Sequence, residues 1–360
     1  MCTTARPGPQ TFACVNIFRF MLDTLLKGLI SLLPVTVLLI VLYRLDSHRL
    51  LGTHFIFRIF LAGGLSAVVC YYINAFAIDY LALEFAGYTR FAGPFIEETV
   101  KASILVYLFR TNRIGFLIDA GILGFTVGAG FSFVENIYYL HAASEHHYGV
   151  WVVRGFGTAI MHGGATALFA IIAETLTERH LKMNPLFYLP GLMVAVVLHS
   201  IFNHFPVSPI LSTVVTLLIL PTMLFLLFER SETTIHNFLE KDMAAHRKLL
   251  DQIRHGDLTG CEAGRFLKDM QEKLEAPVAA EMVEYFCIHT ELILSAESIL
   301  LVREKGIDVE VGADIQDKLG RMHALEQYIG RAGMRTLRIH LEFTAKDMWE
   351  IYLLEGEVVS

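Results

Sequence analysis

The chain has 360 residues, of which 54% are hydrophobic and 18% are charged. This composition excludes an ordinary soluble domain of the same length and is typical of a membrane protein. The net charge of −7 is spread along the chain without a basic stripe, so we expect no nucleic acid partner. The five cysteines form no CxxC pair, and neither a disulfide framework nor a cysteine zinc site is indicated.

Seven apolar runs, each about 20 residues long, could span a membrane as helices. They cover residues 25–43, 59–78, 91–109, 114–140, 151–173, 186–205 and 210–228. Residues 1–24 form an N-terminal segment that does not have the pattern of a cleaved signal peptide. The sequence therefore predicts an all-α fold, in which residues 25–228 form a polytopic transmembrane helix bundle of about seven spans and interact with membrane lipids.

The composition changes sharply after residue 228. Charged, amphipathic segments with helical periodicity follow at residues 234–253, 261–274 and 278–302, and residues 306–312 read as a loop. Residues 229–360 are therefore predicted to form a soluble, mostly helical C-terminal domain. Its amphipathic helices favour a role in self-association or in binding a regulator.

Basic residues in the short loops predict the orientation of the bundle. They occupy alternate loops and the start of the C-terminal domain, as Arg44 with Arg49, Arg110 with Arg113, Arg179 with Lys182, and Arg230. These segments are expected in the cytoplasm, together with the C-terminal domain. This orientation puts the N-terminus outside, and Arg6, Arg19 and Lys27 disagree with that position, but four segments outweigh one.

Six polar residues lie inside the apolar runs, where an ionisable side chain costs several kcal/mol unless it is paired. They are Glu97, Glu98, Glu135, His162, His199 and Asn203. The predicted topology places them on four spans in the same outer half of the bilayer. Such clustering indicates a site for chemistry inside the membrane.

The residue types in this cluster fit metal-assisted hydrolysis. Imidazoles and a carboxylate are the usual ligands of a catalytic zinc ion, which keeps one position open for water. His162, His199 and Glu135 are the predicted ligands. No HExxH motif is present, so the arrangement differs from that of the common zinc proteases.

The remaining polar residues have predicted roles in catalysis. Glu97 is the predicted general base, and Glu98 is its partner or a supporting group that pairs with Lys101 one helical turn away. Asn203 shares a helix face with His199 and could donate a hydrogen bond to the oxyanion of the tetrahedral intermediate.

Four short motifs follow one another on consecutive spans: Glu97-Glu98-x-x-Lys101, Phe131-x-x-x-Glu135-Asn136, His162-Gly163-Gly164 and His199-x-x-x-Asn203. In this order they resemble the motifs of the PrsW-type intramembrane proteases, a family distantly related to the CAAX-prenyl endopeptidase and bacteriocin-processing membrane proteases. The resemblance covers roughly residues 55–228. It implies a multi-pass protein of the bacterial cytoplasmic membrane that cuts a single-span membrane protein near its extracytoplasmic face, the best-known substrate being an anti-sigma factor.

Other interpretations stay open from the sequence. The reaction could use Glu/His acid–base chemistry without a metal. The same carboxylates and histidines could instead form a proton or cation pathway of a transporter, although a pathway would distribute polar residues through the whole depth of the bilayer. A third alternative is a non-catalytic membrane sensor that recruits partners through its C-terminal domain.

Overall fold

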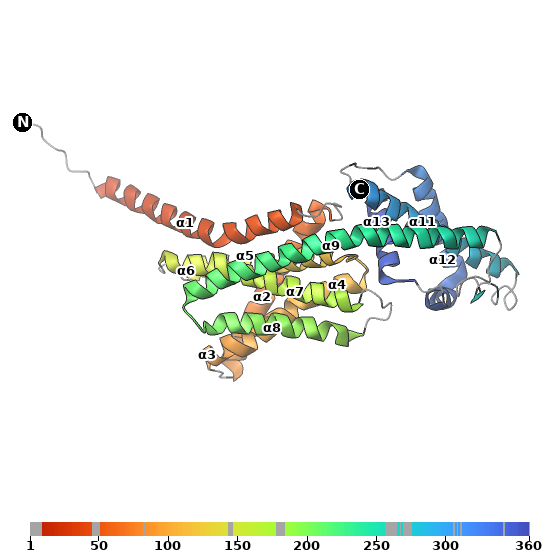
Figure 1. The fold of residues 1–360 in the computed structure, drawn as a ribbon. Helices are drawn as coiled ribbons and strands as arrows, with labels where there is room; N and C mark the ends of the chain where they lie inside the picture. Colours follow the sequence, from red (N-terminus) through yellow and green to blue (C-terminus); the bar gives the residue numbers. More distant parts are fainter. Residues whose placement is uncertain are drawn as a thin grey trace, which may run out of the picture.

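The computed structural model describes the chain apart from thirteen short stretches. These are residues 1–8, 45–50, 82–83, 143–146, 178–183, 256–264, 267, 269–275, 305–306, 308, 310–311, 341–342 and 360. Most of the predicted helix 261–274 and of the predicted loop 306–312 lie outside the described residues, as do Arg6, Arg49, Arg179 and Lys182. The described residues form helices and their connections, so the predicted all-α fold is confirmed (Figure 1).

The N-terminal two thirds of the chain form a bundle of long helices (Figure 1). In chain order these elements are α1 (Pro9–Arg44), α2 (Thr53–Leu81), α3 (Phe85–Gly87), the π-helical η1 (Tyr88–Ala92), α4 (Gly93–Arg110), α5 (Leu117–Ala142), α6 (Tyr148–Val152), the π-helical η2 (Val153–Thr158), α7 (Ala159–Thr177), the 3-10 helix η3 (Pro185–Tyr188), α8 (Leu189–His204) and α9 (Pro209–Arg254). The segment α6–η2–α7 forms one span, which changes its helical pitch at η2.

Helix α5 lies in the centre of the bundle and packs against α1, α2 and α7. Small residues allow these close approaches, as is usual between helices in a membrane. A side chain at Gly128 would overlap the backbone of His162 on α7, and one at Gly130 would overlap the carbonyl of Phe60 on α2. The glycines of α5 therefore set its distance from both neighbours, and with it the position of His162.

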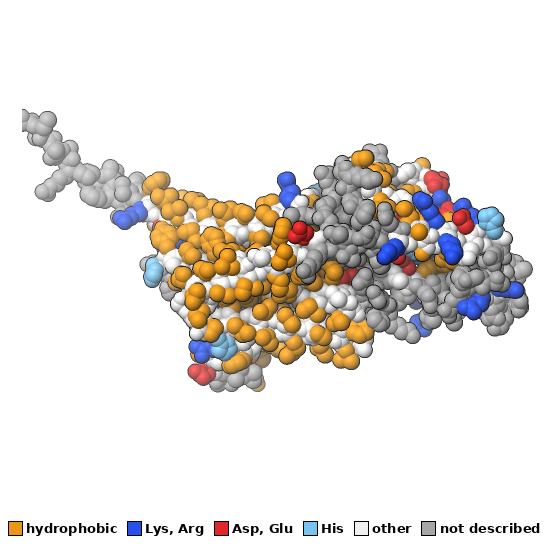
Figure 2. Space-filling view, in the orientation of Figure 1, with side chains coloured by type: hydrophobic (Ala, Val, Ile, Leu, Met, Phe, Trp, Pro, Cys, Tyr) orange, Lys and Arg blue, Asp and Glu red, His pale blue; other side chains and the backbone are white. Residues whose placement is uncertain are grey.

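The outer surface of the bundle is apolar over most of the face seen in Figure 2. Among the described residues, seven helices are long and apolar enough to cross a membrane, the number that the sequence predicts. Their identities differ at two places. Helix α4 is not among them because it carries Glu97, Glu98, Lys101 and Arg110, and the segment Val278–Arg303 of α11 is among them.

The apolar residues of α11 are largely accounted for by the C-terminal helices. Helices α11 (Ala276–Glu304), α12 (Ala313–His340) and α13 (Ala345–Val359) pack with the end of α9 around a separate core. Tyr285, Leu292 and Ala296 of α11 are buried in that core. Packing against these helices therefore gives the apolar residues of α11 a buried environment inside the domain that the sequence predicts to be soluble.

Helix α13 contacts the membrane bundle at the connection between α4 and α5. The Trp349 ring occupies the space that Gly115 leaves, and a side chain at Gly115 would overlap this ring. The same ring packs edge-on against Phe116, at a centroid distance of 5.0 Å. Arg113 lies over the ring of Tyr352 at 5.2 Å. The C-terminal helices are thus joined to the loop that directly follows α4.

Candidate active site

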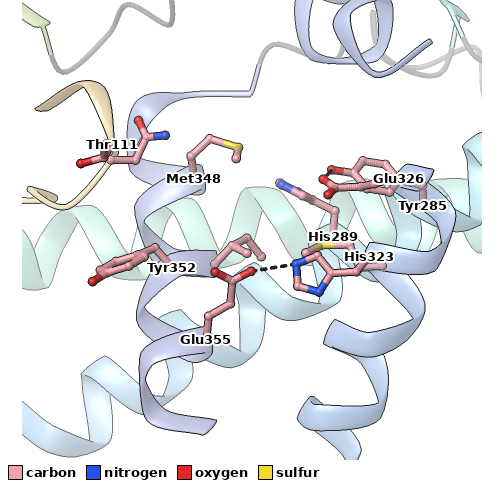
Figure 3. A pocket seen from close by; sticks show the side chains of 11 residues that line it. Thr111, Tyr285, His289, His323, Glu326, Met348, Tyr352 and Glu355 are labelled. Atoms are coloured by element: carbon pink, nitrogen blue, oxygen red, sulfur yellow. Dashed lines mark hydrogen bonds and ion pairs between the residues drawn. The ribbon is translucent and has the colours of Figure 1, made fainter. Parts of the chain in front are cut away.

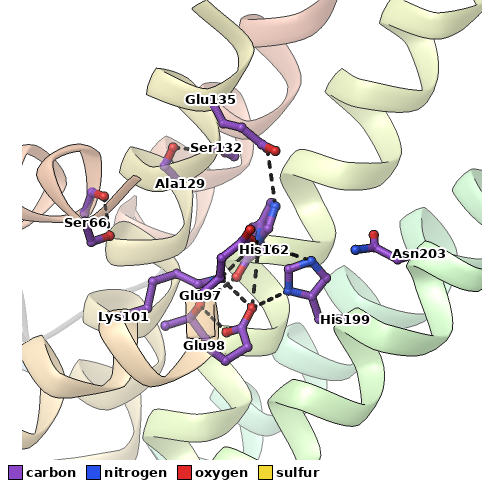
Figure 4. Close-up of polar contacts among 12 residues, drawn as sticks. Ser66, Glu97, Glu98, Lys101, Ala129, Ser132, Glu135, His162, His199 and Asn203 are labelled. Carbon is purple, nitrogen blue, oxygen red and sulfur yellow. Dashed lines mark hydrogen bonds and ion pairs between the residues drawn. The ribbon is translucent and has the colours of Figure 1, made fainter. Parts of the chain in front are cut away.

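Four helices bring the predicted site residues together inside the bundle (Figure 4). Glu97 and Glu98 lie near the beginning of α4, and His162 lies near the beginning of α7. Glu135 and His199 lie toward the ends of α5 and α8. The antiparallel course of these helices explains how residues up to about one hundred positions apart meet in one place.

Glu98 is the most enclosed carboxylate of the group, with 2% exposure. Its Oε1 accepts a hydrogen bond from Lys101 Nζ at 2.5 Å and lies 2.8 Å from Nδ1 of His199. Thr166 on α7 donates to Oε2 at 3.4 Å. Since a carboxylate accepts, His199 donates its Nδ1 proton to Glu98, and its Nε2 keeps a lone pair. Glu98 therefore orients His199 and is itself fixed by Lys101.

Glu97 points to another side of α4 than Glu98, because successive residues on a helix are about 100° apart. Its Oε1 accepts a hydrogen bond from Asn74 Nδ2 on α2 at 3.1 Å, and its Oε2 lies 3.9 Å from His199 Nε2. Glu97, His162 and His199 each offer one ligand atom, and these three atoms lie within 4.8 Å of one another. The donor set of two imidazoles and one carboxylate is that of catalytic zinc sites.

His162 lies between Lys101 and Glu135 and is 1% exposed. Its Nδ1 is 3.1 Å from Lys101 Nζ, and its Nε2 is 3.4 Å from Glu135 Oε2. Because an ammonium group donates, Nδ1 accepts from Lys101, and the neutral ring carries its proton on Nε2. The edge of the His199 ring faces the His162 ring at a centroid distance of 4.6 Å.

Glu135 lies outside the group of three close ligand atoms, although the sequence assigns it as a metal ligand. Its Oε2 is buried and accepts no hydrogen bond from the described residues, but it lies 3.1 Å from Nη2 of Arg154. The carboxylate thus faces His162 with one oxygen that can still accept a proton.

Asn203 lies beside His199, but no contact joins it to the polar network in Figure 4. Its Nδ2 donates to the carbonyl of Thr89 in η1 at 2.9 Å. Ser200, on the same face of α8, donates to the carbonyl of Arg90 at 2.6 Å. In this arrangement Asn203 fastens α8 to η1, and the predicted role as an oxyanion donor would need its second amide proton or a rotated side chain.

Three polar residues of the site were not singled out from the sequence, and one of them is Thr166, which donates to Glu98. Asn74 on α2 holds Glu97, and Arg154 in η2 contacts Glu135. Each is a polar residue inside an apolar run, which is the signal that identified the other six. Arg154 is also close to the end of its predicted span, where an arginine is usually expected to reach the interface.

A cavity of about 210 Å³ lies away from this site, between the C-terminal helices and the residues that follow α4 (Figure 3). Thr111 and Asn112 line it from the bundle, and His289, Glu326 and Tyr352 are among the residues that line it from α11, α12 and α13. It contains none of the six polar residues predicted from the sequence.

These observations define a class of protein: a multi-pass membrane enzyme whose polar site is enclosed by apolar helices. Residues 52–228 match the sequence model of the PrsW family intramembrane metalloproteases. This membrane-embedded part of the chain belongs to that family, and the protein is an intramembrane protease, a peptide hydrolase. The matched segment begins at α2 and ends in α9, so it contains every predicted site residue. No curated protein and no solved structure matches the chain.

Proposed function

We propose that the protein is a zinc-dependent endopeptidase that cuts a single-span membrane protein near the extracytoplasmic face of the bacterial cytoplasmic membrane. The observation that carries the proposal is the close group of Glu97, His162 and His199, inside a segment that matches a metalloprotease family. The basic residues in alternate loops support an extracytoplasmic position for the site and a cytoplasmic position for the C-terminal helices.

The residues present fit a zinc ion. His199 already donates its Nδ1 proton to Glu98 at 2.8 Å, which is the supporting contact that metal-bound histidines usually make. Its Nε2 is therefore available on the side of Glu97. To bind the ion through Nε2 as a neutral imidazole, His162 would take the tautomer with its proton on Nδ1, and Lys101 would then donate to Glu98 alone. Glu97, His162 and His199 would hold the ion, and a bound zinc ion would supply Lewis acidity that lowers the pKa of a water molecule.

The chain's own residues then have distinct tasks. This proposal exchanges the roles predicted from the sequence, since Glu97 becomes a ligand and Glu135 the general base. Glu135 Oε2 accepts no hydrogen bond from the described residues and faces His162, so it is placed to take a proton from the attacking water. Lys101 and Glu98 keep the two imidazoles in place.

The substrate assignment rests on the family and on the position of the site. A single-span substrate can approach a bundle laterally and place an extended segment near the site at one end of the helices. An anti-sigma factor or a similar membrane-anchored regulator would give the protease a role in signalling. The amphipathic C-terminal helices would offer a surface for self-association or for a regulator. Their contact with the loop that follows α4 would connect this surface to the bundle.

Metal analysis of the purified protein in detergent, without chelator, tests the zinc assignment. We expect about one zinc ion per chain in the wild type and none in the variant with His162→Ala and His199→Ala. His204→Ala on the same helix is the matched control and should keep the metal. Absence of metal from the wild type would contradict the zinc mechanism and favour Glu/His acid–base chemistry.

Two single variants separate the roles of the carboxylates. Glu97→Gln should lower the zinc content, because an amide is a weaker ligand than a carboxylate. Glu135→Gln should keep the zinc and retain only a small, measurable residual cleavage of a single-span reporter peptide, because the amide cannot take a proton. The reverse result would restore the assignment of Glu135 as ligand and Glu97 as base.

A further inference from the structure

Arg154 is a charged residue at the active site that the family motifs quoted above do not contain. It lies in the π-helical segment η2, and its side chain is only 13% exposed. An arginine held among membrane helices is costly unless its charge is compensated. The contacts that compensate the charge of Arg154 therefore indicate its role at the site.

One turn of α5 surrounds the guanidinium group on three sides. Nη2 lies 3.1 Å from Glu135 Oε2, and Nε donates to Asn136 Oδ1 at 2.8 Å. The ring of Tyr139 lies under the group, 3.7 Å from Cζ. Because the guanidinium group is planar and rigid, contacts in its plane and on its face fix its orientation. The position of Nη2 relative to Glu135 is therefore fixed as well.

The neighbouring backbone supports this arrangement. Asn136 Nδ2 donates to the carbonyl of Ser31 on α1 at 2.9 Å, so the residue that holds Arg154 is itself held. Gly155, the next residue after Arg154, lies so close to α1 that a side chain would overlap the carbonyl of Ile30. Single π-helical turns are frequent at functional sites. Here the turn of η2 carries Arg154 to the end of α5 that bears Glu135.

We infer that Arg154 is a positioning residue of the proteolytic site, which holds the Glu135 carboxylate toward His162. The inference rests on the proposed function of Glu135. Nε2 of His162 lies 3.4 Å from the same Oε2 that contacts Arg154, so the arginine and the histidine confine this oxygen from two sides. Without Arg154 the carboxylate would lose its charge partner and the constraint on its direction.

A double-mutant cycle with Glu135 tests this inference. The variants are Arg154→Gln, Glu135→Gln and the pair, each measured for zinc content and for kcat and KM on a fluorogenic single-span peptide that the wild type cleaves. We expect Arg154→Gln to lower kcat by about 10- to 100-fold, as is usual for residues that support a metal site from outside. The zinc content and KM should stay close to those of the wild type, and Arg154→Lys should recover part of kcat.

The coupling between the substitutions of Arg154 and Glu135 shows whether Arg154 acts through Glu135. If Arg154 acts through Glu135, Arg154→Gln should cause no further loss of cleavage in the Glu135→Gln background. Independent, multiplicative losses, or loss of zinc in Arg154→Gln, would overturn the inference while the proposed function stands. A wild type without zinc and without cleavage would instead reject the proposed function and, with it, this role of Arg154.

Two further sets of variants guard against misfolding. Arg110→Gln, at the exposed end of α4, is the control for loss of an arginine and should cleave like the wild type. If Arg154→Gln does not fold, Asn136→Ala and Tyr139→Leu replace it. They remove the two supports of the guanidinium group but leave its pairing with Glu135, and they should lower kcat in the same way. Unchanged kcat in both would overturn the inference.

Discussion

The carboxylate of Glu98 on α4 lies 2.8 Å from Nδ1 of His199 on α8, and the same oxygen accepts a hydrogen bond from Lys101. This contact determines which nitrogen of His199 carries the proton and which one faces Glu97. A buried lysine and a buried carboxylate on α4 thus define the tautomer of an imidazole on α8, about one hundred positions away in the sequence.

Removal of Lys101 should be severe. The side chain is fully buried and contacts both Glu98 and His162. Lys101→Met would leave Glu98 as an uncompensated buried charge, which typically costs about 3–5 kcal/mol. Thermal unfolding in detergent should show a large decrease in stability, together with loss of cleavage. Addition of Glu98→Gln should recover part of the stability, and a Lys101→Met variant as stable as the wild type would refute this account of the pair.

The close approach of α5 and α7 at Gly128 should control the position of His162. A methyl group at Gly128 would overlap the His162 backbone, so Gly128→Ala should push α7 outward and cost about 1–3 kcal/mol. Zinc content and thermal stability should both decrease. Gly28→Ala is the matched control, because its added methyl group would meet its nearest neighbour, Leu140 Cδ1, at 3.8 Å. Equal behaviour of the two variants would show that this approach does not position the site.

The contact of Trp349 with the α4–α5 connection should hold the C-terminal helices on the bundle. Trp349 is 3% exposed, and truncation of a buried tryptophan to alanine costs about 3–5 kcal/mol. Trp349→Ala should therefore speed hydrogen exchange in residues 111–116 and in α13. Tyr328→Ala, at a position on α12 with 59% exposure, should leave exchange there unchanged. Wild-type exchange in Trp349→Ala would exclude this ring as the main attachment.

A buried carboxyl group near the same junction should make stability depend on pH. Glu350 is 0% exposed, and burial, together with the nearby Glu297 and Asp347, raises the pKa of its carboxyl group well above the ordinary value, against the opposing effect of Lys346. The folded state then binds its proton more tightly than the unfolded state. Its contribution to stability is complete below the ordinary pKa of a glutamate and is lost as the pH rises through the raised pKa.

Substitution of this carboxyl group by an amide should remove that dependence. Glu350→Gln keeps the shape of the protonated acid, so its unfolding temperature should exceed that of the wild type by a few degrees at alkaline pH and converge with it at acidic pH. The melting curves of both proteins between these limits provide the measurement. Glu355→Gln, on the same helix but with a more exposed side chain, should follow the wild type. Parallel curves for Glu350→Gln and the wild type would refute the assignment.

The sequence predicted the family, the helical class and the number of membrane-spanning segments, because all three depend on composition and on short motifs. It also predicted that His162 and His199 would meet, since their helices run so that both lie at the same end. It did not predict which carboxylate approaches them. That choice depends on how α4 is rotated in the bundle, which turns Glu97 toward Asn74 and Glu98 toward His199.

Other features depend on packing that no single segment encodes. Arg154 was not singled out from the sequence, because its partners, Asn136 and Tyr139, belong to another helix. Helix α11 is apolar enough by composition to cross a membrane. Its apolar residues are instead buried against α9, α12 and α13, which its own sequence does not reveal. Local patterns therefore located the helices, whereas the pairing of their faces needed the three-dimensional arrangement.

Helix α9 continues without interruption for 46 residues, from the surface of the bundle to the core of the C-terminal helices. At 1.5 Å per residue it is about 69 Å long, more than twice the thickness of the hydrocarbon layer, which is about 30 Å. Because each residue of a helix is rotated by about 100° from the one before it, the orientation of one end of α9 about the helix axis fixes the orientation of the other end. Two residues inserted beyond Glu229 would turn the far end by about 200°, whereas seven would return it to within about 20° of its original phase. The angular position of the C-terminal core around the axis of α9 therefore depends on the number of residues between the bundle and that core.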